Sequence, residues 1–299
     1  MKNTPFTRIL SFVLILALLL QVFPAQVFAA SNVPETVATF QPSETPAEDE
    51  EPEDVHIVEE ITEKRTEFTK SFKLSNGLNM AAVYPNAVHY EENGTWKEID
   101  NTLQLEQRDS QNVYINKAGS WKVQLPQDLT SDSGVSVSRD DHTLRFYMAG
   151  ELRTSTEQDA QSAATFSAKD TGVAAYSRRA AKNSTAMVEK IDMSKAKAEA
   201  EYPEMIAEKL SSRMRYSDIY ENTDIVYDLN SNQLKESIIM EQYDADLHGY
   251  SYILEVSDMI PVLAEDHTIE LYDKIGGTVI MSMPAPYLVD DAEEYCYGV

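Results

Sequence analysis

The sequence has almost no cysteine. Cys296 is the only one among 299 residues, so a disulfide within the chain is excluded. A stable fold must therefore come from a buried apolar core or from a bound ion. We expect Cys296 to be an incidental thiol and not a nucleophile, because none of the five histidines stands near it in the sequence.

Basic residues are also scarce. The chain has 25 Lys and Arg against 50 Asp and Glu, which gives a formal net charge of −25. Nucleic-acid binding depends on clustered Lys and Arg, and anionic lipid surfaces attract basic segments. The charge therefore predicts a chain that binds no nucleic acid and does not adhere to a membrane surface.

Long apolar runs are rare, and one stands out, "ILSFVLILALLLQVF" at residues 9–23. It follows Lys2 and Arg8 and precedes the small-x-small pattern Val27–Ala29, so residues 1–29 are predicted to be a signal peptide cleaved after Ala29. A membrane span takes about 20 apolar residues, more than this run offers. A retained N-terminal anchor is the alternative. We expect the mature chain, with a net charge of −27, to be extracellular, secreted or associated with the cell wall.

The motifs of common catalytic and metal sites are missing. The sequence has no G-x-S-x-G, no Gly-rich phosphate loop, no H-E-x-x-H and no C-x-x-C. It therefore predicts no catalytic, cofactor-binding or metal-binding residue, no cofactor and no enzymatic activity. A pair of carboxylates for glycoside hydrolysis stays open, because sequence does not reveal the distance between acids.

Composition divides the rest of the chain. Residues 30–61 are rich in Pro, Thr and acids and are predicted to form a disordered spacer; a calcium trap at residues 48–54 is the alternative. Residues 62–150 form a first predicted β module, and residues 151–202 a linker or insertion. Residues 203–297 carry a short helix, from Glu204 to about Ser211, and a second β module.

The β prediction comes from turns and alternation. Asn93-Gly94 tolerates the positive φ of a type I′ turn and separates the strands 88–92 and 95–100. Apolar residues alternate with polar ones from Trp121 to Leu125, and again at Leu144, Phe146 and Met148. The fold class is therefore mainly β, with antiparallel, sandwich-like modules.

The two β regions resemble each other. "DDHTLRFY" (residues 140–147) and "EDHTIELY" (residues 265–272) share an acid, Asp-His-Thr and an alternating strand. We interpret them as two related modules or two halves of one sandwich. His142 and His267 would share an ion only if the two copies faced each other; we expect half-exposed turn residues instead.

The turn-rich stretch from Arg213 to Met240 contains three aspartates. Asp224 and Asp228 would share one face of a strand, but about 13 Å apart, which is too far for one ion. Asp218 does not complete a calcium loop. We therefore expect two strands and a turn with solvent-facing carboxylates.

Aromatic residues offer one more hypothesis. Sixteen tyrosines together with Trp96 and Trp121 are typical of strand packing. The alternative is a glycan or partner contact at Trp96 and Trp121.

Three segments resemble a known family. They are "SFKLSNGLNMAAVYPNAVHYEENGTWKEIDNTL" (residues 71–103), "LSSRMRYSDIYENTDIVYDLNSNQLKESIIM" (residues 210–240) and "IELYDKIGGTVIMSMPAPYLVDDAEEY" (residues 269–295). Their order resembles that of the N-terminal region of secreted, wall-associated RHS/YD-repeat proteins of Gram-positive bacteria.

The resemblance implies a non-catalytic, β-rich display region that precedes a shell of YD repeats and a C-terminal toxic domain used in contact-dependent competition. This chain has no YD repeats, so it is interpreted as a truncated fragment whose partner would be the missing RHS shell or cell-wall polysaccharide. Two alternatives are a stand-alone carbohydrate-binding adhesion module and a secreted hydrolase that uses an acid pair.

Overall fold

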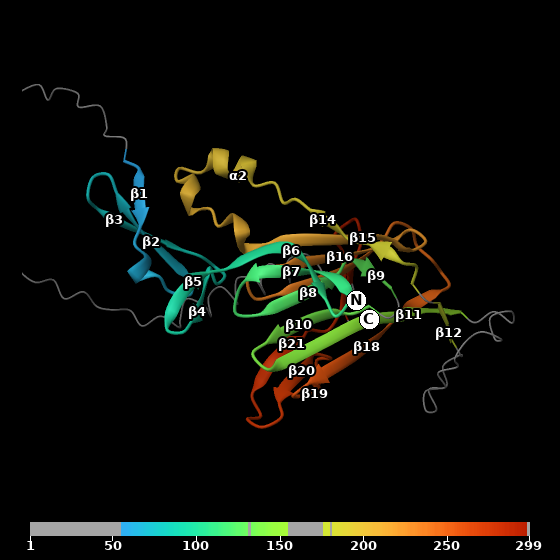
Figure 1. The fold of residues 1–299 in the computed structure, drawn as a ribbon. Coiled ribbons are helices and arrows are strands. Elements are labelled where there is room, and N and C mark those ends of the chain that lie inside the picture. Colours follow the sequence, from blue (N-terminus) through green and yellow to red (C-terminus); the bar gives the residue numbers. More distant parts are fainter. Residues whose placement is uncertain (1–54, 131–132, 155–175, 180, 298–299) are drawn as a thin grey trace, which may run out of the picture. The chain divides into compact units, whose positions relative to one another are not determined.

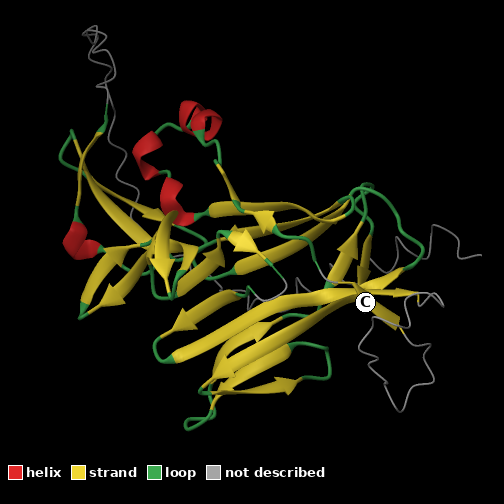
Figure 2. Cartoon of the chain, turned by 45° about the vertical axis from the view of Figure 1, so that its right-hand side comes forward, coloured by secondary structure: helices red, strands yellow, loops and turns green. Residues whose placement is uncertain are grey.

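The computed structural model describes residues 55–130, 133–154, 176–179 and 181–297. The predicted signal peptide, residues 30–54 of the spacer and residues 155–175 of the predicted linker lie outside this range. The described residues form mainly antiparallel β-sheet with a few short helical segments, drawn in red in Figure 2. None of the described helices is long and apolar enough to cross a membrane.

The first sheet and a neighbouring hairpin come from the start of the described chain. The sheet order is β1 (Ile57–Glu60), β2 (Thr69–Leu74) and β3 (Asn79–Val83), with the 3-10 turn η1 (Thr62–Lys64) between β1 and β2. The hairpin consists of β4 (His89–Glu92) and β5 (Thr95–Glu98). Its turn residues Asn93 and Gly94 have φ of 53° and 73°, which confirms the turn that the sequence predicts. β1 lies within the range assigned to the spacer.

The largest described sheet draws strands from both predicted β modules. Its strands, in spatial order, are β12 (Tyr176–Arg179), β11 (His142–Thr154), β10 (Val135–Arg139), β8 (Lys122–Pro126), β7 (Gln111–Ala118) and β6 (Asp100–Arg108), with β18 (Leu247–Ser257) paired to β11. Figure 1 shows β18 beside β11. β11 crosses the predicted module boundary at residue 150, and its pairing with β18 joins the two regions in one sheet.

The remaining strands lie mostly in the second half of the chain. A second sheet has the order β14 (Met187–Glu189), β15 (Ser212–Tyr220), β16 (Thr223–Leu229) and β17 (Leu234–Met240). A third has β19 (Met259–Leu263), β20 (Ile269–Asp273) and β21 (Val279–Met283). Short pairs join β9 (Asp128–Leu129) to β13 (Ser184–Thr185), and β22 (Tyr287–Val289) to β23 (Tyr295–Tyr297).

One apolar core joins the largest described sheet to the second and third sheets. The alternating residues Leu144, Phe146 and Met148 of β11 are buried, as the pattern predicts. They belong to the same cluster as buried side chains of β15, β16, β19 and β20. The rings of Phe146 and Tyr227 lie 6.4 Å apart, and the Tyr216 hydroxyl donates to the Pro126 carbonyl at 2.5 Å. Sheets that bury their apolar faces against one another are the sandwich-like arrangement that the alternation favours.

The helix predicted from Glu204 to Ser211 does not form. That segment makes two 3-10 turns, η3 (Pro203–Met205) and η4 (Glu208–Leu210), and a short α-helix lies earlier, at α2 (Ser194–Glu199). Ile206 has extended backbone angles, which separates the two turns. So short a segment gains too few hydrogen bonds to offset the cost of starting a helix.

Candidate functional site

The structure places the two predicted contact residues in different surroundings. Trp96 lies on β5, opposite Glu91 in the hairpin, and is half-buried. Trp121 precedes β8, packs against the core cluster and donates its indole N–H to the Ser231 carbonyl at 2.7 Å. Trp121 is therefore held by the fold, whereas Trp96 lies in the β4–β5 hairpin.

Three tyrosines form an exposed aromatic group on the described part of the chain. Tyr287, Tyr295 and Tyr297 are exposed on β22 and β23, with ring centroids 5.7 to 6.2 Å apart. The Lys235 ammonium lies 6.0 Å from the Tyr287 ring centroid. The sequence pattern did not single out this hairpin, because Pro284 and Pro286 lie just before β22 and proline interrupts a regular strand ladder.

The aspartates of the Arg213–Met240 stretch do not form a joint site. Asp228 accepts two hydrogen bonds from Arg213, at 2.6 and 3.0 Å. Asp224 accepts one from Arg215 at 2.9 Å and one from the Asp218 backbone N–H at 2.9 Å. Each carboxylate is thus paired with its own arginine across the β15–β16 strand pair.

The histidines of the two related motifs occupy different positions. His142 begins β11, and its Nε2 lies 3.1 Å from Oδ1 of Asp273. His267 is exposed in the turn before β20, with φ of 66°. The two motifs are therefore similar in sequence but differ in local structure. His142 is paired with a carboxylate, whereas His267 terminates a turn.

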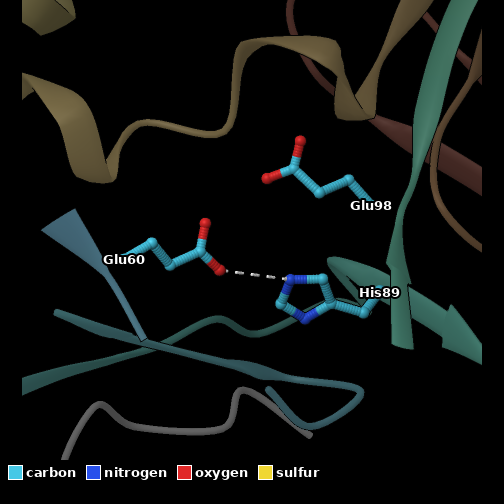
Figure 3. Close-up of side chains that lie close together, drawn as sticks. All are labelled: Glu60, His89 and Glu98. Atoms are coloured by element: carbon cyan, nitrogen blue, oxygen red, sulfur yellow. Dashed lines mark ion pairs between the residues drawn. The ribbon is translucent and has the colours of Figure 1, made fainter. Parts of the chain in front are cut away.

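A different histidine lies among acids. Glu60, His89 and Glu98 bring one ligand atom each to within 4.8 Å of one another (Figure 3). Glu60 ends β1, whereas His89 and Glu98 stand directly opposite each other on β4 and β5. The type I′ turn fixes that pairing, because in a hairpin with a two-residue loop the residues equidistant from the loop face each other. We call these three residues the Glu-His-Glu cluster.

The His89 ring is fixed by one hydrogen bond and complete burial. Its side chain has no exposed area, and Nδ1 lies 2.7 Å from the Thr66 carbonyl oxygen. A carbonyl can only accept, so Nδ1 carries the proton in the neutral ring and Nε2 is left with a lone pair. Burial lowers the pKa of His89, whereas the hydrogen bond to Thr66 raises it. The nearby positive charges of Arg65 and Lys70 lower it further. The neutral ring is therefore the favoured form.

The Nε2 atom of His89 faces the Glu60 carboxylate. The distance from Nε2 to Oε1 of Glu60 is 3.8 Å, and Nε2 has no hydrogen-bond partner among the described residues. Figure 3 shows the ring edge and this carboxylate facing each other, with the Glu98 carboxylate pointing into the same space. A buried polar atom without a partner is rare in folded proteins and asks for an explanation.

Two cations neutralise the acids of the cluster. Arg65 donates to both oxygens of Glu60, at 2.7 and 3.0 Å, and approaches Glu98 at 3.5 Å. Lys70 donates to Glu98 at 2.5 Å. The Lys70 bond is the main cause that lowers the pKa of Glu98, and the Glu60 bond is the main cause that raises the pKa of Arg65.

A cavity of about 150 Å³ adjoins the cluster. Glu98 and Lys70 line it together with Val88, Ile99 and residues 206–210, which include η4. The Glu98 side of the cluster therefore has open space next to it, whereas the His89 side is closed. Carboxylates and a neutral imidazole are ligands for transition metals, and the same groups are general acids and bases.

The members of the Glu-His-Glu cluster have no motif spacing in the sequence, so no pattern predicts the cluster. Glu60 lies inside the range assigned to the spacer, and His89 lies inside the predicted strand 88–92. One signal was available. Once the Asn93-Gly94 turn is accepted, pairing outward from it places His89 opposite Glu98. The approach of Glu60 depends on the β1–β2 pairing, which local patterns do not encode.

Comparison with known proteins identifies similar chains. The tRNA3(Ser)-specific nuclease WapA of Bacillus spizizenii is 25% identical over 97% of this chain. The tRNA nuclease WapA of Bacillus subtilis is 24% identical over 97%, and the tRNA(Glu)-specific nuclease WapA of Bacillus subtilis subsp. natto is 23% identical over 95%. The chain spans 11% of the length of each of these relatives. No protein-family model matches the sequence, and no solved structure matches it.

These findings correct several predictions. The identification with RHS/YD-repeat proteins is wrong, since no such family matches and the similar proteins are named as tRNA nucleases. The predictions of a non-catalytic display region or adhesion module, of no enzymatic activity and of no nucleic-acid partner are contradicted by the same names. The total charge was used to exclude a nucleic-acid partner, and the lack of contiguous motifs was used to exclude enzymatic activity; neither inference is physically sufficient. Net charge averages over the whole surface, and active-site groups can come from distant segments.

Proposed function

We propose that this chain is a segment of an exported tRNA nuclease of the WapA type and is required for its activity. The observation that carries the proposal is the similarity to three such nucleases along 95–97% of the chain. Similarity that continues over nearly the whole chain supports a shared role better than a short motif would. Because the chain spans 11% of those relatives, the tRNA cleavage of the whole protein is part of the proposal.

The predicted layout fits export. Residues 1–29 would direct secretion and be removed after Ala29, and residues 30–61 would separate the folded part from the cleavage site. The predicted modules 62–150 and 203–297, with 151–202 between them, complete the layout as part of this proposal. Association of the mature chain with the cell wall is the location that we propose.

The Glu-His-Glu cluster is not assigned to tRNA cleavage. His89 has no exposed side-chain area, so a tRNA phosphate cannot reach its ring. The guanidinium of Arg65 and the ammonium of Lys70 are already paired with Glu60 and Glu98. The proposed nuclease role therefore rests on the similarity to the WapA proteins and not on the cluster.

A segment exchange tests the proposal. The part of Bacillus subtilis WapA that matches residues 30–299 is replaced by those residues, and a deletion variant lacks that part altogether. Both retain the parent protein's own export signal. We expect the exchanged protein to reach the cell surface and cleave tRNA, and the deletion variant to lose surface-located cleavage. Protein amount is measured by immunoblot and cleavage by the loss of intact tRNA on denaturing gels.

A second measurement locates the chemistry. Purified residues 30–299 are incubated with total tRNA, with and without EDTA. Cleavage by this chain alone supports the proposal and places the reaction inside it. The proposal is overturned if the isolated chain leaves tRNA intact and the exchanged protein, present in normal amount, is no more active than the deletion variant.

A further inference from the structure

We propose that Glu60, His89 and Glu98 form a binding site for one divalent transition-metal cation of the zinc class. The three ligand atoms lie within 4.8 Å of one another, and they come from β1, β4 and β5. This inference is independent of the tRNA nuclease role, because it concerns only the described residues and a bound ion.

The orientation of the His89 ring favours metal binding. Its Nδ1 is engaged by the Thr66 carbonyl at 2.7 Å, which directs the lone pair of Nε2 toward Glu60. Metal-binding histidines are held in this manner, with the second ring nitrogen bonded to a backbone carbonyl or a carboxylate. The Nε2 lone pair and a carboxylate oxygen 3.8 Å away, beside a fully buried ring, are arranged as two ligands of one cation would be.

The distances between the ligand atoms also favour a zinc-class ion. Zinc lies about 2.0–2.2 Å from nitrogen and carboxylate ligands, so two ligand atoms around it are separated by about 3.4 Å. The 3.8 Å between His89 Nε2 and Glu60 Oε1 is close to that value. The Glu98 side chain, which is 44% exposed and adjoins the cavity, has freedom to move inward. A set of one imidazole and two carboxylates favours zinc or a similar transition metal over magnesium, which prefers oxygen ligands alone.

Arg65 and Lys70 would compete with a metal ion for the two carboxylates. Arg65 and Lys70 occupy the carboxylates in this structure, so an entering dication must replace at least part of their pairing. Lys70 also lines the cavity, so there is space beside its side chain. Removal of the Lys70 charge should therefore strengthen metal binding, whereas a cluster that is only an internal ion-pair network would gain no metal affinity.

Calorimetric titration of the mature chain, residues 30–299, tests the site. The protein is stripped with EDTA and titrated with Zn²⁺, and Co²⁺ absorption spectra report the ligand geometry. We expect one tight equivalent of Zn²⁺ and a higher melting temperature in its presence. His89→Gln should abolish the tight equivalent and the Co²⁺ spectrum, and Lys70→Gln should bind Zn²⁺ more tightly than the parent.

Matched variants separate the site from the acidic surface. His142→Gln removes another half-buried histidine and should leave the tight equivalent intact. Glu98→Gln removes one ligand without touching the buried ring, so it keeps the test valid if His89→Gln fails to fold. Glu92→Gln, on the exposed end of the same hairpin, is its control. The proposal is overturned if the parent chain shows no tight equivalent, or if His89→Gln and Glu98→Gln bind Zn²⁺ as the parent does.

Discussion

His142 on β11 pairs with Asp273 at the end of β20, with 3.1 Å between Nε2 and Oδ1. The first residue belongs to one copy of the related motif, and the second follows the other copy by one position. The Gly276 backbone N–H also donates to Asp273. One carboxylate thus ties the turn of the β20–β21 hairpin to the largest described sheet.

This pairing predicts a loss of stability in acid. The Gly276 hydrogen bond, and after it the His142 bond, lower the pKa of Asp273 below its ordinary value of 3.8. A lowered carboxyl pKa stabilises the fold above that ordinary value, and the stabilisation is lost as the pH falls through the lower, folded value. Asp273→Asn should therefore be less stable than the parent near neutral pH, and the difference should shrink in acid. Urea unfolding from pH 3 to pH 7 measures this, with Glu265→Gln as the exposed control; a difference that does not change with pH would contradict it.

Glu236 predicts the opposite dependence on pH. Its carboxylate accepts hydrogen bonds from the hydroxyls of Tyr227 and Tyr252, and burial raises its pKa above the ordinary 4.5. A raised carboxyl pKa means that the folded protein holds the proton more tightly, so stability falls as the pH rises from 4.5 through the folded value. Glu236→Gln should remove this decrease. The two proteins are compared by urea unfolding between pH 4 and pH 8, with Glu241→Gln as control; equal slopes in parent and variant would refute the assignment.

We expect Trp121 to stabilise the folded state. Trp121→Phe keeps an aromatic ring but removes the N–H that donates to Ser231, which should cost about 1 kcal/mol of unfolding free energy. Trp96→Phe should cost less, because Trp96 does not belong to the core cluster. Chemical denaturation of both variants checks the order. A larger loss for Trp96→Phe would show that the hairpin, and not the core, depends on its tryptophan.

Gly94 links the turn to the Glu-His-Glu cluster. Its φ of 73° is strained for any residue with a Cβ, although no atom lies near the position that a Cβ would take. Gly94→Ala should therefore cost about 1 kcal/mol through the backbone alone. Because the turn sets His89 opposite Glu98, the variant should also bind Zn²⁺ more weakly. Gly119→Ala, at a glycine without positive φ, is the control, and unchanged zinc affinity in Gly94→Ala would contradict the link.

Local patterns predicted the parts of the fold that neighbouring residues decide. The alternation at Leu144, Phe146 and Met148 identified a strand with one buried face, and Asn93-Gly94 identified a turn. The helix at 204–211 failed because single-residue propensity does not include the cost of starting so short a helix. The pairing of β11 with β18 was beyond reach, since many amphipathic strands could satisfy the same alternation.

The Glu-His-Glu cluster shows the same limit for sites. His89 and Glu98 follow from the hairpin register, but Glu60 reaches them only through the pairing of β1 with β2. The burial of His89 and the lack of a partner for its Nε2 are properties of the packed molecule. Residue types alone therefore could not distinguish His89 from the other four histidines.

The β11–β18 pair also bears on how the chain reaches its folded state. Thr143 pairs with Ser257, and Arg153 with Leu247, so β11 leaves the ribosome roughly a hundred residues ahead of its partner. Until then one edge of β11 presents unpaired N–H and C=O groups, and such edges bind other extended chains. Slow translation would prolong that interval. Correct folding would then depend on the speed of synthesis, or on a chaperone that shields the open edge.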